Sequence, residues 1–296
     1  MRFNRILAAA AASVIATTSL VACSSDSSSE AGGADGDTVT VKIGTTDADM
    51  LAWTAFEDEA EKLGIDLDIV RFSEYPQVNP AHVQGQMEVS KFQTINYQAQ
   101  YNADAGEDLR IIGSGEINVL GLYWKDHDSL DGIEGTEIAI PNDPSNQGRA
   151  INVLVQAGLV TLRDGAPKLT PTPANIDKDA SKVKVVAVDA SQTPNAYNEG
   201  RPAVINNNWL QRGGIDPASS VAADDPNSEL AEPYINVFTV KAEDVDNETY
   251  AKLVDAWQSD AVTEALNEDS NGTAVQVKRS PEELNTILDE LVEEYK

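Results

Sequence analysis

Residues 38–70, TVTVKIGTTDADMLAWTAFEDEAEKLGIDLDIV, decide the fold class. Residues 38–44 alternate polar and apolar side chains, which predicts a strand. Apolar residues from Trp53 to Leu63 then share one face of a predicted helix, and Gly64 ends it. Residues 65–70 predict a second strand. A strand, a helix and a strand within about 35 residues favour a parallel pair with a crossover helix, which is typical of an α/β protein.

The same alternation continues along the chain. One helix is predicted at residues 148–157, ended by Gly158. The remaining predicted strands are a long segment within residues 109–122 and shorter ones at residues 137–140, 183–188, 203–205 and 236–240. Ser280-Pro-Glu-Glu283 forms a capping box before a last helix, whose apolar stripe from Leu284 to Leu291 favours packing on its own domain.

The length and the order of these elements predict two lobes. The first would consist of residues 38–120 with 236–296, and the second of residues 121–235. We expect the chain to cross between them near residues 121–123 and to return near residues 234–236. Ligands of open α/β sheets bind at the carboxyl ends of strands, so a ligand cleft is expected between the lobes.

The N-terminus predicts export. Residues 1–22 combine two Arg with an apolar stretch too short for a membrane span of about 20 residues, as in a signal peptide. Leu20-Val-Ala-Cys23 resembles a bacterial lipobox, in which the Cys carries the lipid; the alternative is an ordinary signal peptide with a chance Cys. Residues 23–37 are rich in Ser, Gly and acids and predict a flexible linker. The protein is therefore expected on the extracytoplasmic face of the cell membrane, anchored by lipid at Cys23.

Composition excludes several function classes. The 296 residues include 49 acidic and 21 basic side chains, a net charge of −28, which argues against nucleic acid and against a basic lipid-binding patch. One Cys and two distant His, His82 and His127, argue against a disulfide and against a metal site. The chain has no nucleophile elbow, zinc-protease motif or phosphate loop, and no cofactor motif, so we expect no enzyme activity and no cofactor.

One segment has the chemistry of a receptor. Residues 141–150, PNDPSNQGRA, lie between a predicted strand and a predicted helix. Asn, Asp and Ser cap helices, and a helix N-terminus presents free N–H groups. Arg149 adds a two-pronged donor that fits a carboxylate. The alternative is a capped helix on which Arg149 forms a salt bridge with one of the many acids.

Residues 140–165, IPNDPSNQGRAINVLVQAGLVTLRDG, resemble the signature region of the NlpA family, the methionine-binding lipoproteins of bacterial ABC importers. Further matches lie in order along residues 42–45, 72–75, 92–93, 121–123, 203–208 and 233–236. The resemblance implies a type II periplasmic-binding-protein fold that captures methionine between two lobes. It also implies delivery to a membrane permease that works with two ATPase subunits.

The resemblance also implies a set of ligand-binding residues. Arg149 matches the family's carboxylate-binding Arg, and Asn206 and Asn236 match ligand-binding Asn residues that suit a zwitterion. Tyr75 matches a pocket aromatic, which would contact a thioether favourably. The other expected lining residues are Phe92, Thr94, Tyr97 and Asn146. As alternatives, Tyr75 is a core residue, and Asn206 or Asn208 caps a helix that starts near Trp209.

One segment departs from the family pattern. Where the family commonly has Phe-Phe-Gln-His-x-Pro-Tyr, this chain has Lys91-Phe-Gln-Thr-Ile-Asn-Tyr97. Thr94 thus replaces a pocket His and Lys91 replaces a Phe, which is expected to enlarge one wall of the pocket. Methionine remains the expected ligand, with another amino acid or a short methionine-containing peptide as the alternative. An enzyme of the same fold and a surface adhesion or scaffold protein are the alternatives from other classes.

Overall fold

The computed structural model describes residues 38–296. The predicted signal peptide, Cys23 and the linker lie outside the described residues. The helices are α1 (Leu51–Lys62), α2 (Val78–Val83), α3 (Ile95–Ala105), α4 (Pro144–Gln156), α5 (Thr193–Asn198), α6 (Asn207–Gly213), α7 (Glu248–Trp257), α8 (Asp260–Asp269) and α9 (Pro281–Tyr295). Within residues 38–296, none of the helices combines the length and the apolar character that crossing a membrane requires.

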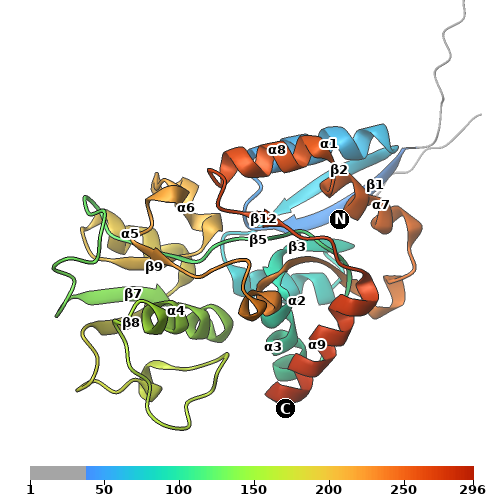
Figure 1. The fold of residues 1–296 in the computed structure, drawn as a ribbon. Helices are drawn as coiled ribbons and strands as arrows, with labels where there is room; N and C mark the ends of the chain where they lie inside the picture. The colour runs from blue at the N-terminus through green and yellow to red at the C-terminus, as the bar shows by residue number, and fades with distance from the viewer. Residues whose placement is uncertain (1–37) are drawn as a thin grey trace, which may run out of the picture. The chain divides into compact units, whose positions relative to one another are not determined.

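Two five-stranded sheets organise the described chain. The first sheet contains β1 (Val39–Thr45), β2 (Ile65–Arg71), β3 (Val89–Thr94), β4 (Leu109–Ser114) and β11 (Asn236–Lys241). The second contains β6 (Gly121–Tyr123), β7 (Glu137–Pro141), β8 (Lys184–Val188), β9 (Ala203–Ile205) and β10 (Ala222–Ala223). A short ribbon pairs β5 (Glu116–Ile117) with β12 (Val275–Gln276). We refer to each large sheet with its helices as the first and the second lobe (Figure 1).

The two sheets have the same topology. Their strand orders are β2-β1-β3-β11-β4 and β8-β7-β9-β6-β10. In each sheet, three parallel strands are followed by an antiparallel strand, which is β11 in the first sheet and β6 in the second. The segment that precedes each of these two strands carries the chain from one sheet to the other, and we call it a passage. The chain leaves the first lobe through residues 118–120 and returns between β10 and β11 over residues 224–235. Each passage therefore leads into the antiparallel strand of a sheet, β6 or β11, which is the second strand from one edge.

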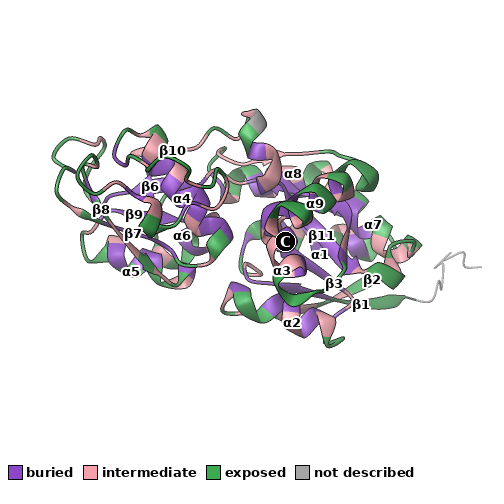
Figure 2. Cartoon of the chain, turned by 90° about the horizontal axis from the view of Figure 1, so that it is seen from below, coloured by how far each residue is buried: buried purple, intermediate pink, exposed green. Residues whose placement is uncertain are grey.

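The predicted β-α-β unit is confirmed. β1 and β2 are parallel, with Val39 opposite Ile65, and Gly64 takes the left-handed conformation at φ 76°. The buried face of α1 packs on the sheet, where the ring of Phe56 meets that of Phe238 in β11 edge to face at 6.0 Å. Buried residues gather in the interior of each lobe, and exposed ones lie on the outer helices and loops (Figure 2). A further apolar cluster joins the lobes, because it contains Tyr75 and Phe92 of the first and Trp209 of the second.

The single long strand predicted within residues 109–122 is wrong. The segment forms β4, β5 and β6, which belong to three different sheets. The chain changes partners at Gly115, whose N–H still donates to the carbonyl of Asn236 in β11 at 2.8 Å, while its carbonyl accepts from the N–H of Val277, next to β12, at 2.9 Å. A Cβ on Gly115 would lie 3.3 Å from both Lys91 Cε and Trp257 Nε1. Residues 121–123 belong to the second sheet as β6, and residues 118–120 join the two sheets.

Helix α4 begins four residues before the predicted start. Asp143 is its N-cap and accepts a hydrogen bond from the N–H of Asn146, and Pro144 occupies the first helical position. Both are favoured at these places, since a cap satisfies a free N–H and Pro has none to satisfy. The earlier start brings Asn146 and Arg149 onto the first two turns of one helix.

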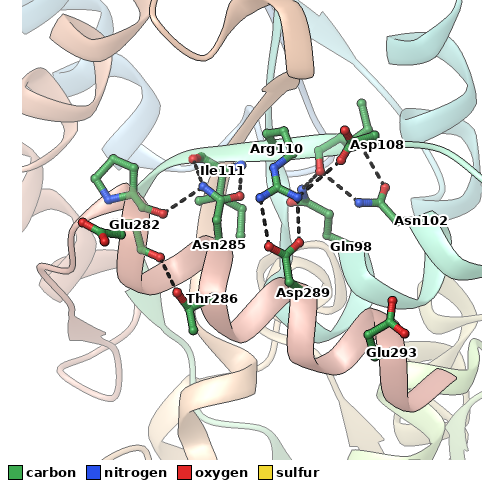
Figure 3. Close-up of polar contacts among 12 residues, drawn as sticks. Gln98, Asn102, Asp108, Arg110, Ile111, Glu282, Asn285, Thr286, Asp289 and Glu293 are labelled. Atoms are coloured by element: carbon green, nitrogen blue, oxygen red, sulfur yellow. Dashed lines mark hydrogen bonds and ion pairs between the residues drawn. The ribbon is translucent and has the colours of Figure 1, made fainter.

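The C-terminal helix α9 packs on the first lobe, as predicted. Leu284, Leu288 and Leu291 are buried, and Ser280 and Glu283 form the capping box. Figure 3 shows how polar side chains align α9 with β4. Asn285 accepts from the N–H of Ile111 at 3.1 Å and donates to its carbonyl at 2.7 Å, while Arg110 pairs with Asp289 at 2.7 Å.

Candidate functional site

One pocket between the lobes is lined by all eight residues that the sequence predicted for ligand binding. Elements of the first lobe contribute Tyr75, Phe92, Thr94, Tyr97 and Asn236, and the second lobe contributes Asn146, Arg149 and Asn206. The remaining lining residues are Gln93, Asn118, Val119, Leu120, Asn207 and Asn208. Helix N-termini, strand ends and the passage at residues 118–120 therefore meet at one place.

Aromatic rings form one wall of the pocket. Tyr75 lies between Tyr97 and Trp209, with ring centroids 6.0 and 5.1 Å away, and Phe92 lies 5.8 Å from Tyr97. The Tyr75 hydroxyl donates to Asn208 at 3.0 Å. Burial raises the pKa of both Tyr75 and Tyr97, so their hydroxyls stay protonated. Tyr75 is at once a buried residue and a lining residue of the pocket.

Asparagine side chains form a second wall. The Nδ2 of Asn206 donates to the Oδ1 of Asn146 at 2.8 Å, whereas the buried Oδ1 of Asn206 has no hydrogen-bond partner among the described residues. Asn206 precedes α6, but its side chain makes no capping bond. Asn208 instead donates to Asp47 Oδ2 at 2.8 Å. Asn206 therefore occupies the N-cap position of α6 but does not cap it through its side chain, and Asn208 lies inside the helix. The Oδ1 of Asn206 remains as an acceptor for a ligand donor.

Arg149 lies on the second turn of α4 and is held firmly. Its Nε donates to Asp224 Oδ2 at 2.6 Å, and its Nη2 donates to the Asn118 carbonyl at 2.8 Å. The guanidinium carbon lies 4.3 Å above the Tyr234 ring. Arg149 thus does form a salt bridge with an acid, the alternative that the sequence left open. The bond to Asp224 uses only one edge of the guanidinium, and Nη1 makes no hydrogen bond to the described residues.

Asp143 places a buried negative charge close to the aromatic wall. Its Oδ1 accepts from the N–H and the Nδ2 of Asn146, both at 2.9 Å. Its Oδ2 is inaccessible to solvent and has no partner among residues 38–296, although the residue as a whole is only half-buried. Burial raises the pKa of Asp143 to about 6, and the hydrogen bonds from Asn146 oppose this. The charge of Asp143 contributes to the raised pKa of Tyr75 and Tyr97, so it acts on both lining rings.

The two departures from the family pattern have different places in the structure. Thr94 lines the pocket, and its Oγ1 also accepts from the N–H of Tyr97 as the N-cap of α3. Lys91 does not line the pocket. Its side chain is buried, and Nζ pairs with Glu116 Oε1 at 2.8 Å. Only Thr94 can therefore change the size of the pocket directly.

Several site residues were missed by the sequence reasoning. Residues 118–120 lie between two short strands with no motif, and nothing in the sequence distinguishes Asp224 among 49 acids. Gln93 and Asn208 stood inside matched motifs, so proximity to Phe92 and Asn206 was a usable signal. Together the pocket offers a free guanidinium edge, a free amide acceptor and an apolar aromatic wall. This combination fits a small zwitterion with an apolar side chain.

Comparisons with known proteins show which family this chain belongs to. The profile of the NlpA lipoprotein family matches residues 41–278. The D-methionine-binding lipoprotein MetQ of Salmonella typhi is 34% identical over 220 residues, which cover 73% of this chain and 79% of that protein.

Two solved structures have the same fold. A nutrient binding protein from Burkholderia cenocepacia bound to methionine superposes with a TM-score of 0.73 at 30% identity, covering 80% of this chain and 99% of that one. The substrate binding protein of a methionine transporter from Streptococcus pneumoniae gives a TM-score of 0.73 at 27% identity, with 80% and 95% covered. The predicted two-lobed fold of the periplasmic-binding-protein type is confirmed.

Proposed function

Because the chain belongs to the NlpA lipoprotein family, we propose that it binds methionine and delivers it to an ABC importer. The observation that carries the proposal is the pocket between the lobes. Arg149, Asn206 and Asn236 line the same pocket as the rings of Tyr75 and Phe92. The names of the relatives supply the ligand, since one binds D-methionine and another was solved with methionine.

Each part of methionine has a matching group in the pocket. The free edge of Arg149 is suited to the carboxylate, because a guanidinium offers paired donors. The unpartnered Oδ1 of Asn206 is suited to accept from the ammonium. The side-chain amide of Asn236 bonds to no other described residue, so it can accept from the ammonium or donate to the carboxylate. The thioether is assigned to the wall of Tyr75, Phe92 and Tyr97, where sulfur–aromatic contacts are favourable.

The partners follow from this role. A binding protein delivers its ligand to a membrane permease, whose ATPase subunits drive uptake. We assign the anchor to a lipid on Cys23, which places the lobes on the extracytoplasmic face of the cell membrane at the end of the linker at residues 23–37. No catalytic step is assigned to the pocket, and the protein acts as a receptor rather than as an enzyme.

Isothermal titration calorimetry on the purified protein tests the proposal. L-methionine and D-methionine are titrated next to norleucine, which has a methylene in place of the sulfur, and next to leucine. Methionine is expected to bind more tightly than norleucine and leucine, and to raise the melting temperature as binding to the native state requires. The proposal is wrong if methionine does not bind while another ligand from a screen of amino acids and short peptides does.

A further inference from the structure

A buried ion pair lies next to the passage between the lobes. Lys91 in β3 and Glu116 in β5 have side chains only 2% and 3% exposed, with Nζ and Oε1 2.8 Å apart. Lys91 Nζ also lies 4.0 Å above the ring of Trp257, and Trp257 Nε1 donates to Glu116 Oε2 at 3.2 Å. Removing two charges from water is costly, and apolar residues often stabilise such a place equally well. Stability alone is therefore a weak reason for this pair.

The pair is connected to the pocket through Asn118. The side-chain Nδ2 of Asn118 donates to Glu116 Oε1 at 3.2 Å. The carbonyl of the same residue accepts from Arg149 Nη2 at 2.8 Å. Asn118 therefore joins the carboxylate of Glu116 to the guanidinium that faces the pocket. The position of the Asn118 carbonyl therefore helps to set the orientation of the Arg149 guanidinium.

The same pair supports the return of the chain into the first lobe. Gly115 fits between Lys91 and Trp257, and its N–H donates to the carbonyl of Asn236 at 2.8 Å. Asn236 is itself a lining residue of the pocket. The ion pair is thus bonded to Asn118 and lies beside Gly115, and these two residues bond to Arg149 and Asn236, which are both assigned to the ligand.

We propose that the Lys91–Glu116 pair is a positioning device that aims Arg149 at the ligand carboxylate through Asn118. This inference rests on the proposed function, because it assumes that Arg149 binds a carboxylate. Glu116 needs its charge in order to hold Asn118 and Trp257 at once, one on each oxygen. Lys91 holds that carboxylate in place inside the core through the 2.8 Å contact between Nζ and Oε1.

The test compares L-methionine with L-methioninol, which has a hydroxymethyl group in place of the carboxylate. The measured quantity is the ratio of the two dissociation constants, which we call the carboxylate preference. Glu116→Gln and Lys91→Met are expected to reduce the carboxylate preference about tenfold, within the range for residues in one hydrogen-bond network. Methioninol binding should remain close to that of the wild type. Each single variant leaves one buried charge without its partner and can fail to fold for that reason. The double variant Lys91→Met/Glu116→Gln removes both charges and is therefore measured as well.

Leu266→Ala is the matched control, because it opens a cavity in the same lobe without touching the pair. It is expected to lower the melting temperature and to leave the carboxylate preference unchanged. A purely structural role for the pair predicts the same behaviour for Glu116→Gln and Lys91→Met, and that result overturns the inference.

The Arg149→Ala background separates this inference from the proposed function. In that background, Glu116→Gln should cause no further loss of carboxylate preference, since it acts through Arg149. A further loss shows that Glu116 acts by another route and rejects the inference alone. If Arg149→Ala itself keeps the full preference, the assignment of the carboxylate to Arg149 is wrong, and the inference is rejected with it.

Discussion

Asp224 accepts a hydrogen bond from Arg149 Nε at 2.6 Å, with the side chains only 13% and 6% exposed. Asp224 also fixes the passage at residues 118–120, because its Oδ1 accepts from the N–H of Leu120 at 2.8 Å. One carboxylate therefore joins the pocket-lining guanidinium to the segment that crosses between the lobes. The arrangement leaves Arg149 preorganised, so little side-chain freedom remains to be lost when a ligand binds.

Arg149→Ala is expected to weaken methionine binding by about 2–5 kcal/mol, the range for losing one partner of a buried charge pair. Arg149→Lys should recover little of this, because an ammonium cannot bond Asp224 and the Asn118 carbonyl and also present a flat edge to a carboxylate. Calorimetry on variants that are folded by circular dichroism measures the loss. Unchanged affinity in folded Arg149→Ala would place the carboxylate elsewhere.

Local patterns and the family resemblance predicted the parts of this protein that depend on short stretches of chain. The β-α-β unit, the capping box at Ser280 and the left-handed Gly158 depend only on neighbouring residues, and all are confirmed. The division of residues 109–122 into three sheets depends on Asn236 and Trp257, which lie far away in the sequence, and was not predictable.

Prediction of the pocket from the sequence has the same limit. The resemblance named eight residues that the structure brings together, but Asp224 and Asn118 carry no local signal. They matter because the fold places them against Arg149. The ion pair of Lys91 is a similar case, since the sequence presented Lys91 only as a departure from a Phe and did not predict its partner Glu116.

Asn285→Ala is expected to destabilise the protein by about 1–3 kcal/mol, because it leaves the N–H and the carbonyl of the buried Ile111 without partners. The free energy of unfolding is measured by urea denaturation. Asp289→Ala, one turn further along α9, removes only a pair with Arg110 in which Asp289 is 60% exposed, and it should cost less than about 1 kcal/mol. Equal losses in the two variants would contradict this account of how α9 is held.

Asp143→Asn is expected to change the pH dependence of stability. Burial raises the pKa of Asp143 to about 6, above the 3.8 of an unperturbed Asp. Between these values the folded protein binds more protons at this site than the unfolded chain does, so its contribution to stability is lost as the pH rises through 6. Asn caps a helix as well as Asp does but does not titrate.

The stability difference, variant minus wild type, should therefore increase between pH 4 and pH 7, by at most about 3 kcal/mol. Urea denaturation of both proteins at pH 4.5, 6 and 7.5 measures this difference. The pH effects of the other acidic residues cancel in it, because both proteins contain them. A constant difference would show that Asp143 ionises as easily in the folded protein as in the unfolded chain, and a difference that decreases with pH would show that it ionises more easily in the folded protein. Either result would contradict the prediction.

Cys23→Ala is expected to release the protein from membranes, because Cys23 is the only thiol available for a lipid. Fractionation of cells that express either form measures the distribution, and mass spectrometry of the N-terminal peptide identifies the attached group. Cys23→Ser is the closest size match and should behave like the Ala variant. A wild-type N-terminal peptide without a lipid-sized mass increment would reject the anchor.

Thr94→His is expected to shift the ligand preference toward free methionine. Thr94 lines the pocket between Phe92 and Tyr97, where a ring would add contact with the ligand side chain. An aromatic contact of this kind contributes about 0.5–1.5 kcal/mol beyond the area it buries. The same change removes the N-cap of α3, so the variant should also lose about 1 kcal/mol of stability. Calorimetric competition between methionine and its best rival, in wild type and variant, measures the shift.

Two further substitutions separate the cap from the pocket. Thr94→Ser keeps the hydroxyl that accepts from the N–H of Tyr97, and it should preserve both stability and the wild-type ranking of ligands. Thr94→Val keeps the size but loses the cap, so it should lower the melting temperature while it leaves the ranking unchanged. A ranking in Thr94→His identical to that of wild type, with the same methionine affinity, would mean that the side chain at position 94 does not select the ligand.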